Sequence, residues 1–127
     1  NNPIANMMSK ILNAEKIGKR ECLFAPISKK SQKVLELLKR EGYILDFKSI
    51  SNQQGGYFVI KLGGKINKCG AISPNFNVKK DGYQVYEKRF LPAKGFGVLL
   101  VTTTQGIMTH IEAQEKGLGG RLLAYCY

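Results

Sequence analysis

The sequence predicts a mixed α/β protein, of the α+β kind, that is divided into two small lobes. In the first half, two apolar patterns repeat at helical spacing, and short β-rich runs lie between and after them. In the second half β-rich runs dominate, and one short helix is expected. The predicted order is therefore α-β-α-β-β in an N-terminal lobe, residues 1–64, and mainly β in a C-terminal lobe, residues 65–127, with Gly63-Gly64 at the boundary.

Two amphipathic helices are expected in the N-terminal lobe. Asn2 can cap the first, and Pro3 stands at the first helical position, where its missing N–H is not needed. Ser28 can cap the second, and Gly18 and Gly42 suit the two helix ends. The first helix has the apolar face Ile4, Met7, Met8, Ile11 and Leu12. The second has the apolar stripe Val34, Leu35, Leu37 and Leu38 and a basic face with Lys29, Lys30, Lys33, Lys39 and Arg40.

Three β-rich runs complete this lobe. Residues 21–25 are expected to form a short strand that Pro26 ends. Residues 43–50 and 57–62 are expected to form a hairpin, because the six residues 51–56, Ser-Asn-Gln-Gln-Gly-Gly, are typical of a turn.

The C-terminal lobe is expected to consist mainly of strands. Between Val78 and Ala93, the positions of Gly82 and Pro92 favour a strand edge followed by an irregular or short helical connection. The other predicted elements are strands at 65–72, 96–101, 107–109 and 121–127, a polar turn at 102–106, a glycine-bounded loop at 118–120, and a short helix from Thr109 or His110 to Lys116.

Basic residues outnumber acidic ones along the whole chain. There are 20 Lys and Arg against 9 Asp and Glu, which gives a formal net charge of +11. The excess is present in both lobes and is not confined to a tail, a pattern that suits a polyanion lying across a folded surface. A basic domain with solvated lysines and a protein bound to an anionic membrane surface are the alternatives. No apolar run approaches the roughly 18 residues of a membrane span, and no secretory signal is visible, so a soluble intracellular protein is expected.

The sequence offers little for metal binding or catalysis. Cys22, Cys69 and Cys126 lie far apart and His110 is the single histidine, so no metal site is expected and the thiols should serve as small buried hydrophobes. No set of nucleophile, base and orienting group is apparent, so we expect no enzyme, no cofactor and no small-molecule substrate. Residues 117–120, Gly-Leu-Gly-Gly, are neither a phosphate-cradling GxGxxG nor set between helices as in a KH domain.

The most informative segment is 102–125. Three consecutive threonines, 102–104, provide short hydroxyl side chains that can reach ribose 2′-hydroxyls or shallow-groove base edges. Gly117, Gly119 and Gly120 can let backbone approach a phosphate without an intervening Cβ. Taken separately, each feature also has an ordinary structural explanation, because threonine runs are common at strand ends and glycines are common in turns.

The whole segment resembles the signature of a universal small-subunit ribosomal protein family, the one numbered eight. The matching positions are Thr102, Thr103, Thr104, Gly106, Met108, Thr109, Ala113, Gly117, Gly119 and Gly120. The steps Pro26-Ile27-Ser28-Lys29, Asn13-Ala14, Gly42-Tyr43-Ile44 and Leu91-Pro92 also match, so the resemblance covers essentially the full chain.

Two features set the chain apart from bacterial members of that family. Arg121 stands where they usually carry Glu directly after the paired glycines, so a contact made by that Glu cannot be transferred to it. Residues 65–72 and 80–90 look like the archaeal and eukaryotic branch.

The resemblance implies a structural protein of the small ribosomal subunit in the cytoplasm. It would bind a helix in the central domain of small-subunit rRNA, support assembly and lie beside other small-subunit proteins, with no membrane partner. The alternative is a translational repressor that binds an rRNA-like site in an mRNA. Tyr86 can stack on a base or ribose, or can simply cap the core. The implied RNA-binding residues are Thr102, Thr103, Thr104, Gly106, Gly119, Gly120, Tyr86, Ser28, Lys29 and Lys30.

Overall fold

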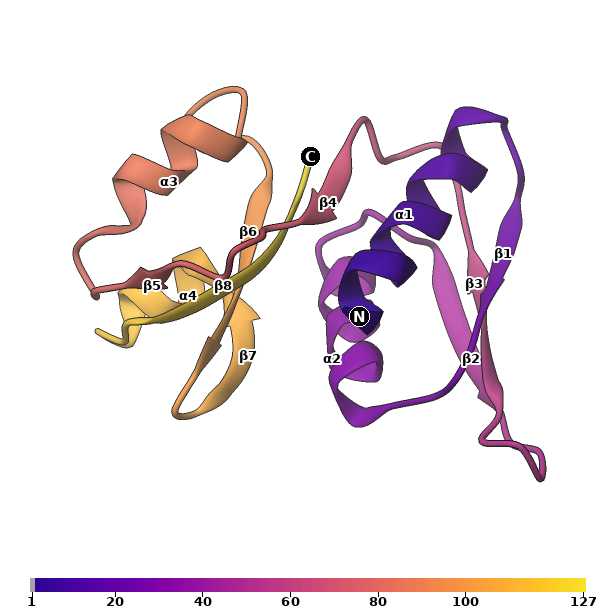
Figure 1. Ribbon diagram of the computed structural model, residues 1–127. Coiled ribbons are helices and arrows are strands. Elements are labelled where there is room, and N and C mark those ends of the chain that lie inside the picture. The colour runs from indigo at the N-terminus through magenta and orange to yellow at the C-terminus, as the bar shows by residue number, and fades with distance from the viewer. Residues whose placement is uncertain (1) are drawn as a thin grey trace. The chain divides into compact units, whose positions relative to one another are not determined.

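The computed structural model describes residues 2–127, and the chain forms two compact units (Figure 1). The first unit ends at Asn67 and the second runs from Lys68 to Tyr127. Each unit contains both helices and strands, which confirms the predicted α+β class. The predicted boundary at Gly63-Gly64 and the separate roles of the two lobes stay predictions.

The first unit is a three-stranded antiparallel sheet with two helices on one side of it (Figure 1). The sheet order is β1-β3-β2, so the central strand is the last one in the sequence. The elements are α1 (Pro3–Lys16), β1 (Glu21–Phe24), α2 (Lys29–Arg40), β2 (Asp46–Ile50) and β3 (Tyr57–Lys61).

Both helices of this unit begin and end as predicted. The Asn2 side chain accepts hydrogen bonds from the first backbone N–H groups of α1, and the Ser28 hydroxyl accepts one from the N–H of Ser31 at 3.1 Å. Gly18 and Gly42 have φ values of +74° and +85°, the left-handed conformation common after a helix. The predicted apolar faces are buried except for Leu12, which is only partly buried: Ile4, Met7, Met8, Ile11, Val34, Leu35, Leu37 and Leu38.

The hairpin between β2 and β3 is confirmed, but its first strand is shorter than predicted. The N–H groups of Tyr43 and Ile44 both donate to the carbonyl of Leu38, at 2.9 and 3.4 Å, so the helix end and not the sheet occupies them. In the turn, the Asn52 side chain accepts from the N–H groups of Gln54 and Gly56 at 2.8 and 2.9 Å.

The second unit is a five-stranded antiparallel sheet with two helices. The path of the sheet is β4-β8-β6-β7, and the short β5 also pairs with β8, so β8 lies between β6 and the β4/β5 side (Figure 1). The elements are β4 (Cys69–Ala71), β5 (Asn77–Val78), α3 (Tyr83–Phe90), β6 (Val98–Thr103), β7 (Gly106–Thr109), α4 (His110–Glu115) and β8 (Gly120–Cys126).

Two predictions for this part of the chain need correction. The strand predicted at 65–72 is reduced to β4, because the N–H groups of Gly64 and Ile66 donate to the Glu15 carboxylate of α1 at 3.2 and 2.9 Å. The polar turn predicted at 102–106 is also shorter, since Thr102 and Thr103 pair with β7 and only residues 104–105 connect the strands. The uncertain stretch before Ala93 contains α3, which is a helix of eight residues.

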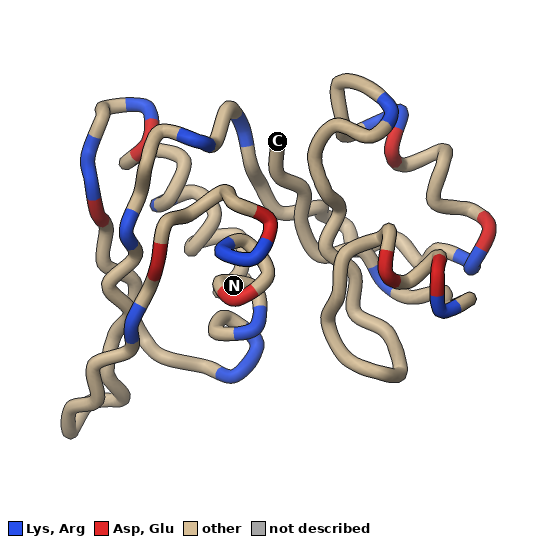
Figure 2. The backbone as a smooth tube through the Cα atoms, turned by 180° about the vertical axis from the view of Figure 1, so that it is seen from behind, with Lys and Arg blue, Asp and Glu red and all other residues tan. Residues whose placement is uncertain are grey.

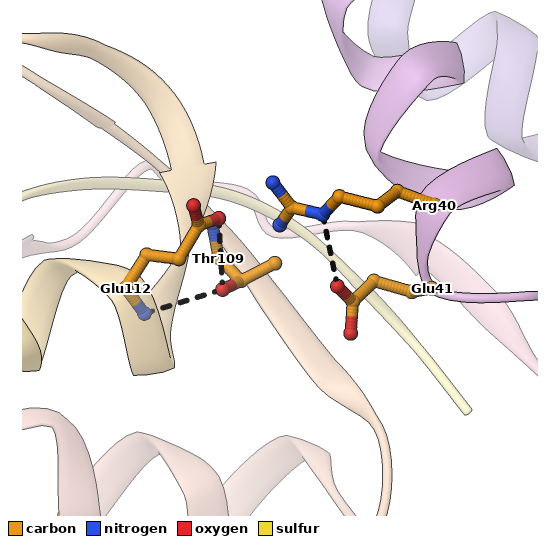
Figure 3. Close-up of polar contacts among 4 residues, drawn as sticks. All are labelled: Arg40, Glu41, Thr109 and Glu112. Carbon is orange, nitrogen blue, oxygen red and sulfur yellow. Dashed lines mark hydrogen bonds and ion pairs between the residues drawn. The ribbon is translucent and has the colours of Figure 1, made fainter.

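The start of α4 is fixed by a reciprocal pair of hydrogen bonds. The Thr109 hydroxyl accepts from the N–H of Glu112, and the Glu112 carboxylate accepts from the N–H of Thr109 (Figure 3). The next residue, His110, is buried and its Nδ1 accepts from the N–H of Leu99 in β6 at 3.1 Å. The helix is therefore held on β6. The core beneath α3 and α4 consists of Ile72, Val78, Tyr83, Leu91, Leu99, Val101, Met108, Ala113 and Leu122.

Candidate nucleic-acid interface

Positive charge is present on both units, as the blue segments of Figure 2 show. On the exposed side of α2, Lys39 pairs with Asp46 at 2.9 Å, and Arg40 pairs with its neighbour Glu41 at 3.2 Å (Figure 3). The hydrogen bond from Lys39 lowers the pKa of the Asp46 carboxyl below its usual value. Lys29 and Lys30, at the start of this helix, are exposed, and no ion pair of theirs is found among residues 2–127. They are thus the lysines of α2 with charge most open to a phosphate.

The three threonines of the run 102–104 have different roles. The Thr103 hydroxyl donates to the carbonyl of Gly106 at 2.9 Å and accepts from the N–H of Gln105 at 3.1 Å, so it closes the β6–β7 turn. Thr102 is half-buried and Thr104 is exposed, and neither hydroxyl takes part in a hydrogen bond found within residues 2–127. Thr102 and Thr104 therefore keep their hydroxyl groups available to a ligand.

The paired glycines are explained by contacts within the protein. A Cβ on Gly119 would lie 2.5 Å from the carbonyl oxygen of Val78, and one on Gly120 would overlap the carbonyl oxygen of Thr102. The sequence suggests that these glycines leave room for a phosphate. The structure already requires them, because the chain at Gly119 and Gly120 approaches the backbone of β5 and of β6 closely. Whether RNA also approaches there stays a prediction.

The loop before these glycines is held from below by a tyrosine. Tyr83 of α3 is fully buried, and its hydroxyl donates to the carbonyl of Leu118 at 3.0 Å. Burial also raises the pKa of this phenol above its usual value. The bond ties residues 117–119 to the core, so the glycine segment has a fixed place beside the threonine hairpin.

A shallow concavity brings most of the predicted residues together. It is lined by Asn77, Val78, Thr102, Thr103, Thr104, Gly119, Gly120 and Arg121. Gly106, the remaining predicted residue of this region, is the Cα partner of Thr103 in the hairpin and has a φ of +109°, which favours glycine.

Asn77 and Arg121 belong to this concavity but are absent from the predicted set. Asn77 lies in a two-residue strand, which is too short to show any periodic pattern, and only the pairing of β5 with β8 places it here. Arg121 stands out in the sequence only as a departure from the bacterial pattern. The sheet register is the signal needed to include both residues.

Four predicted residues lie elsewhere. Tyr86 in α3 is half-buried and packs against the core, with its ring 5.4 Å from that of Phe76, and it does not line the concavity. Ser28, Lys29 and Lys30 belong to the first unit, where the Ser28 oxygen accepts the capping hydrogen bond of α2.

Two observations bear on the alternative classes. Among residues 2–127, no helix is long and apolar enough to cross a membrane. Within the same residues, no group of three or more His, Cys, Asp and Glu side chains is placed to hold a metal ion. The buried His110 is used inside the fold, since its Nε2 also lies 3.3 Å from the Glu87 carboxylate.

The polar, concave hairpin face and the basic surface agree with a comparison against known families. The model of one family, described as ribosomal protein S8, matches residues 2–127. Since this match covers nearly the whole chain, the chain belongs to the ribosomal protein S8 family, the members of which are small-subunit ribosomal proteins that bind rRNA.

Proposed function

We propose that this protein binds a helix in the central domain of small-subunit rRNA and supports the assembly of the subunit around it. It would act in the cytoplasm, within the small subunit and beside other ribosomal proteins. The observation that carries the proposal is the concavity in which the free hydroxyl groups of Thr102 and Thr104 lie beside Arg121 and the paired glycines. Family membership supports rRNA as the ligand.

Hydroxyl groups and lysines would contribute in different ways. A threonine hydroxyl both donates and accepts, so it can pair with a ribose 2′-hydroxyl or a base edge in the wide, shallow groove of RNA. A lysine supplies a mobile point charge, which adds affinity for phosphate and little discrimination between sequences. We therefore assign specificity to Thr102 and Thr104 in the second unit and general affinity to Lys29 and Lys30 in the first.

The remaining predicted positions would act through shape. Thr103, Gly106, Gly119 and Gly120 fix the hairpin and the strand beside it, so a change at any of them would alter the surface that RNA meets. Tyr86 would take part only through the exposed part of its ring, since the rest packs on the core.

Binding to isolated RNA helices tests the proposal. A hairpin that contains the central-domain helix is compared with an equally long helix from another domain of the same rRNA, at several salt concentrations. We expect clear preference for the central-domain helix at moderate salt, and co-sedimentation of the protein with small subunits. Equal affinity for both helices would mean that charge alone drives binding, and the proposal would fail.

A further inference from the structure

We propose that Arg121 binds a phosphate of the rRNA backbone from the centre of a polar row formed with Asn77 and Thr102. This inference rests on the proposed function and deepens it, because it assigns an RNA partner to Arg121, a residue outside the set that the resemblance implies for RNA binding. We call Asn77, Arg121 and Thr102 the polar row.

The register of the sheet places these three residues side by side. Arg121 in β8 is the Cα partner of Asn77 in β5 on one side and of Thr102 in β6 on the other. Side chains of directly paired residues stand on the same face of an antiparallel sheet. The core includes the sequence neighbours of these residues: Val78 follows Asn77 in β5, Leu122 follows Arg121 in β8, and Val101 precedes Thr102 in β6. By alternation, the polar row is on the opposite face of the sheet from that core.

The guanidinium of Arg121 has no partner inside the described chain. Arg121 is exposed, and no hydrogen bond or ion pair found among residues 2–127 involves its guanidinium. The other arginine of this unit, Arg89, is stacked 4.9 Å from the ring centroid of Phe76 and 5.4 Å from that of Phe90. Arg121 is therefore the arginine of the second unit that remains available to a ligand.

The chemistry of the row fits an RNA backbone. A guanidinium only donates hydrogen bonds, and its fork matches two oxygens of one phosphate. In double-helical RNA the deep groove is closed to side chains, so a side chain reaches the phosphates of the backbone or the 2′-hydroxyl groups and base edges of the shallow groove. Of these, only the phosphate offers a full negative charge to the guanidinium. The strand spacing of about 4.8 Å places Asn77 and Thr102 in the two strands that flank Arg121. The Asn77 amide and the Thr102 hydroxyl can there meet the hydroxyl groups of the flanking riboses.

The test compares three variants with the wild type on the central-domain hairpin between about 50 and 200 mM salt. Arg121→Gln should weaken binding about tenfold, the value of a charge-assisted hydrogen bond, and should lower the slope of log K against log salt by about 0.9. Arg121→Lys should keep the slope and lose part of the affinity, because the charge stays and the fork is lost. Lys94→Gln is the matched control: it also removes one exposed charge, but it lies in the loop that enters β6 at the end opposite Thr102.

Each outcome decides one question. If the wild type does not prefer the central-domain hairpin, the proposed function falls and this inference falls with it. If the wild type binds but Arg121→Gln and Lys94→Gln give the same affinity and slope, this inference alone is overturned. A loss of affinity without a change in slope also overturns it, because the contact would not be to phosphate. Melting curves that match the wild type show that the exposed changes leave the fold intact.

A fourth variant tests whether Asn77 belongs to the polar row. Asn77→Ala removes the amide next to Arg121 and should weaken binding about threefold without altering the slope, since no charge is lost. A smaller loss in the double variant Asn77→Ala, Arg121→Gln than the product of the single losses is expected for neighbouring contacts. Asn77→Ala binding as tightly as the wild type would remove Asn77 from the row and overturn the proposal of a three-residue contact.

Discussion

The strongest prediction compares two neighbouring threonines of the β6–β7 hairpin. Thr103 makes two hydrogen bonds within the turn, and Thr104 makes none that is found in the described chain. Replacing each by valine removes the hydroxyl and keeps the branched shape of the side chain. Thr103→Val should therefore reduce stability, whereas Thr104→Val should reduce RNA binding and leave stability unchanged.

The magnitudes follow from the contacts. An exposed neutral hydrogen bond contributes about 0.5 kcal/mol, so the loss of both bonds of Thr103 should lower the free energy of unfolding by about 1 kcal/mol and the melting temperature by about 4 °C. Thr104→Val leaves an RNA group without its partner in the interface. That costs about 1–3 kcal/mol of binding energy, or roughly a 5- to 150-fold weaker affinity.

Thermal melting and filter binding to the central-domain hairpin measure the two effects on the same preparations. Wild-type affinity in Thr104→Val would refute its assignment to the interface. A Thr103→Val variant that melts like the wild type would show that the turn bonds contribute nothing to stability, and the division of roles among the threonines would then be wrong.

Three further predictions concern the support of the site and the first unit. Tyr83→Phe removes the hydrogen bond to the Leu118 carbonyl and should lower the free energy of unfolding by about 1 kcal/mol. Because burial raises the pKa of Tyr83, the neutral phenol stabilises the wild type fully below about pH 10, and this stabilisation is lost as the pH rises further. The melting temperatures of wild type and variant should therefore differ less above about pH 10. Gly120→Ala forces a methyl group against the Thr102 carbonyl, and urea unfolding should show that the free energy of unfolding falls by about 1–3 kcal/mol. Gly117→Ala is the comparison for backbone strain, because Gly117 has a positive φ and its added methyl group would meet nothing within 4 Å. A larger loss in Gly120→Ala would show that packing outweighs backbone strain. Lys29→Gln should reduce the salt slope of RNA binding by about 0.9 with no change in preference between helices, and a changed preference would contradict its role as a general phosphate contact.

Local features of the fold could be predicted from the sequence because their causes are local. The caps Asn2 and Ser28 act on N–H groups within three residues, and the apolar stripe of α2 follows from helical periodicity. The threonine run is recognisable in the same way, as a pattern of neighbouring residues.

What could not be predicted depends on contacts between distant segments. The shortening of β4 depends on Glu15, which lies 51 residues before Ile66 in the sequence and accepts a hydrogen bond from the Ile66 N–H. The inclusion of Asn77 in the interface depends on the pairing of β5 with β8, which no spacing of apolar residues specifies. The separate roles of Thr103 and Thr104 depend on where a tight turn begins, and that is set by pairing across β6 and β7.

The glycines connect the two kinds of information. A side chain at Gly120 would overlap the Thr102 carbonyl, so only glycine lets β8 come this close to β6. That approach is also what makes the next residue, Arg121, the cross-strand neighbour of Thr102 and of Asn77. In the sequence, the glycine pair looks like an RNA contact. In the structure, it allows the strand register in which the side chains proposed to contact RNA lie side by side. A substitution there should weaken RNA binding and stability together, whereas substitutions in the polar row should weaken binding alone.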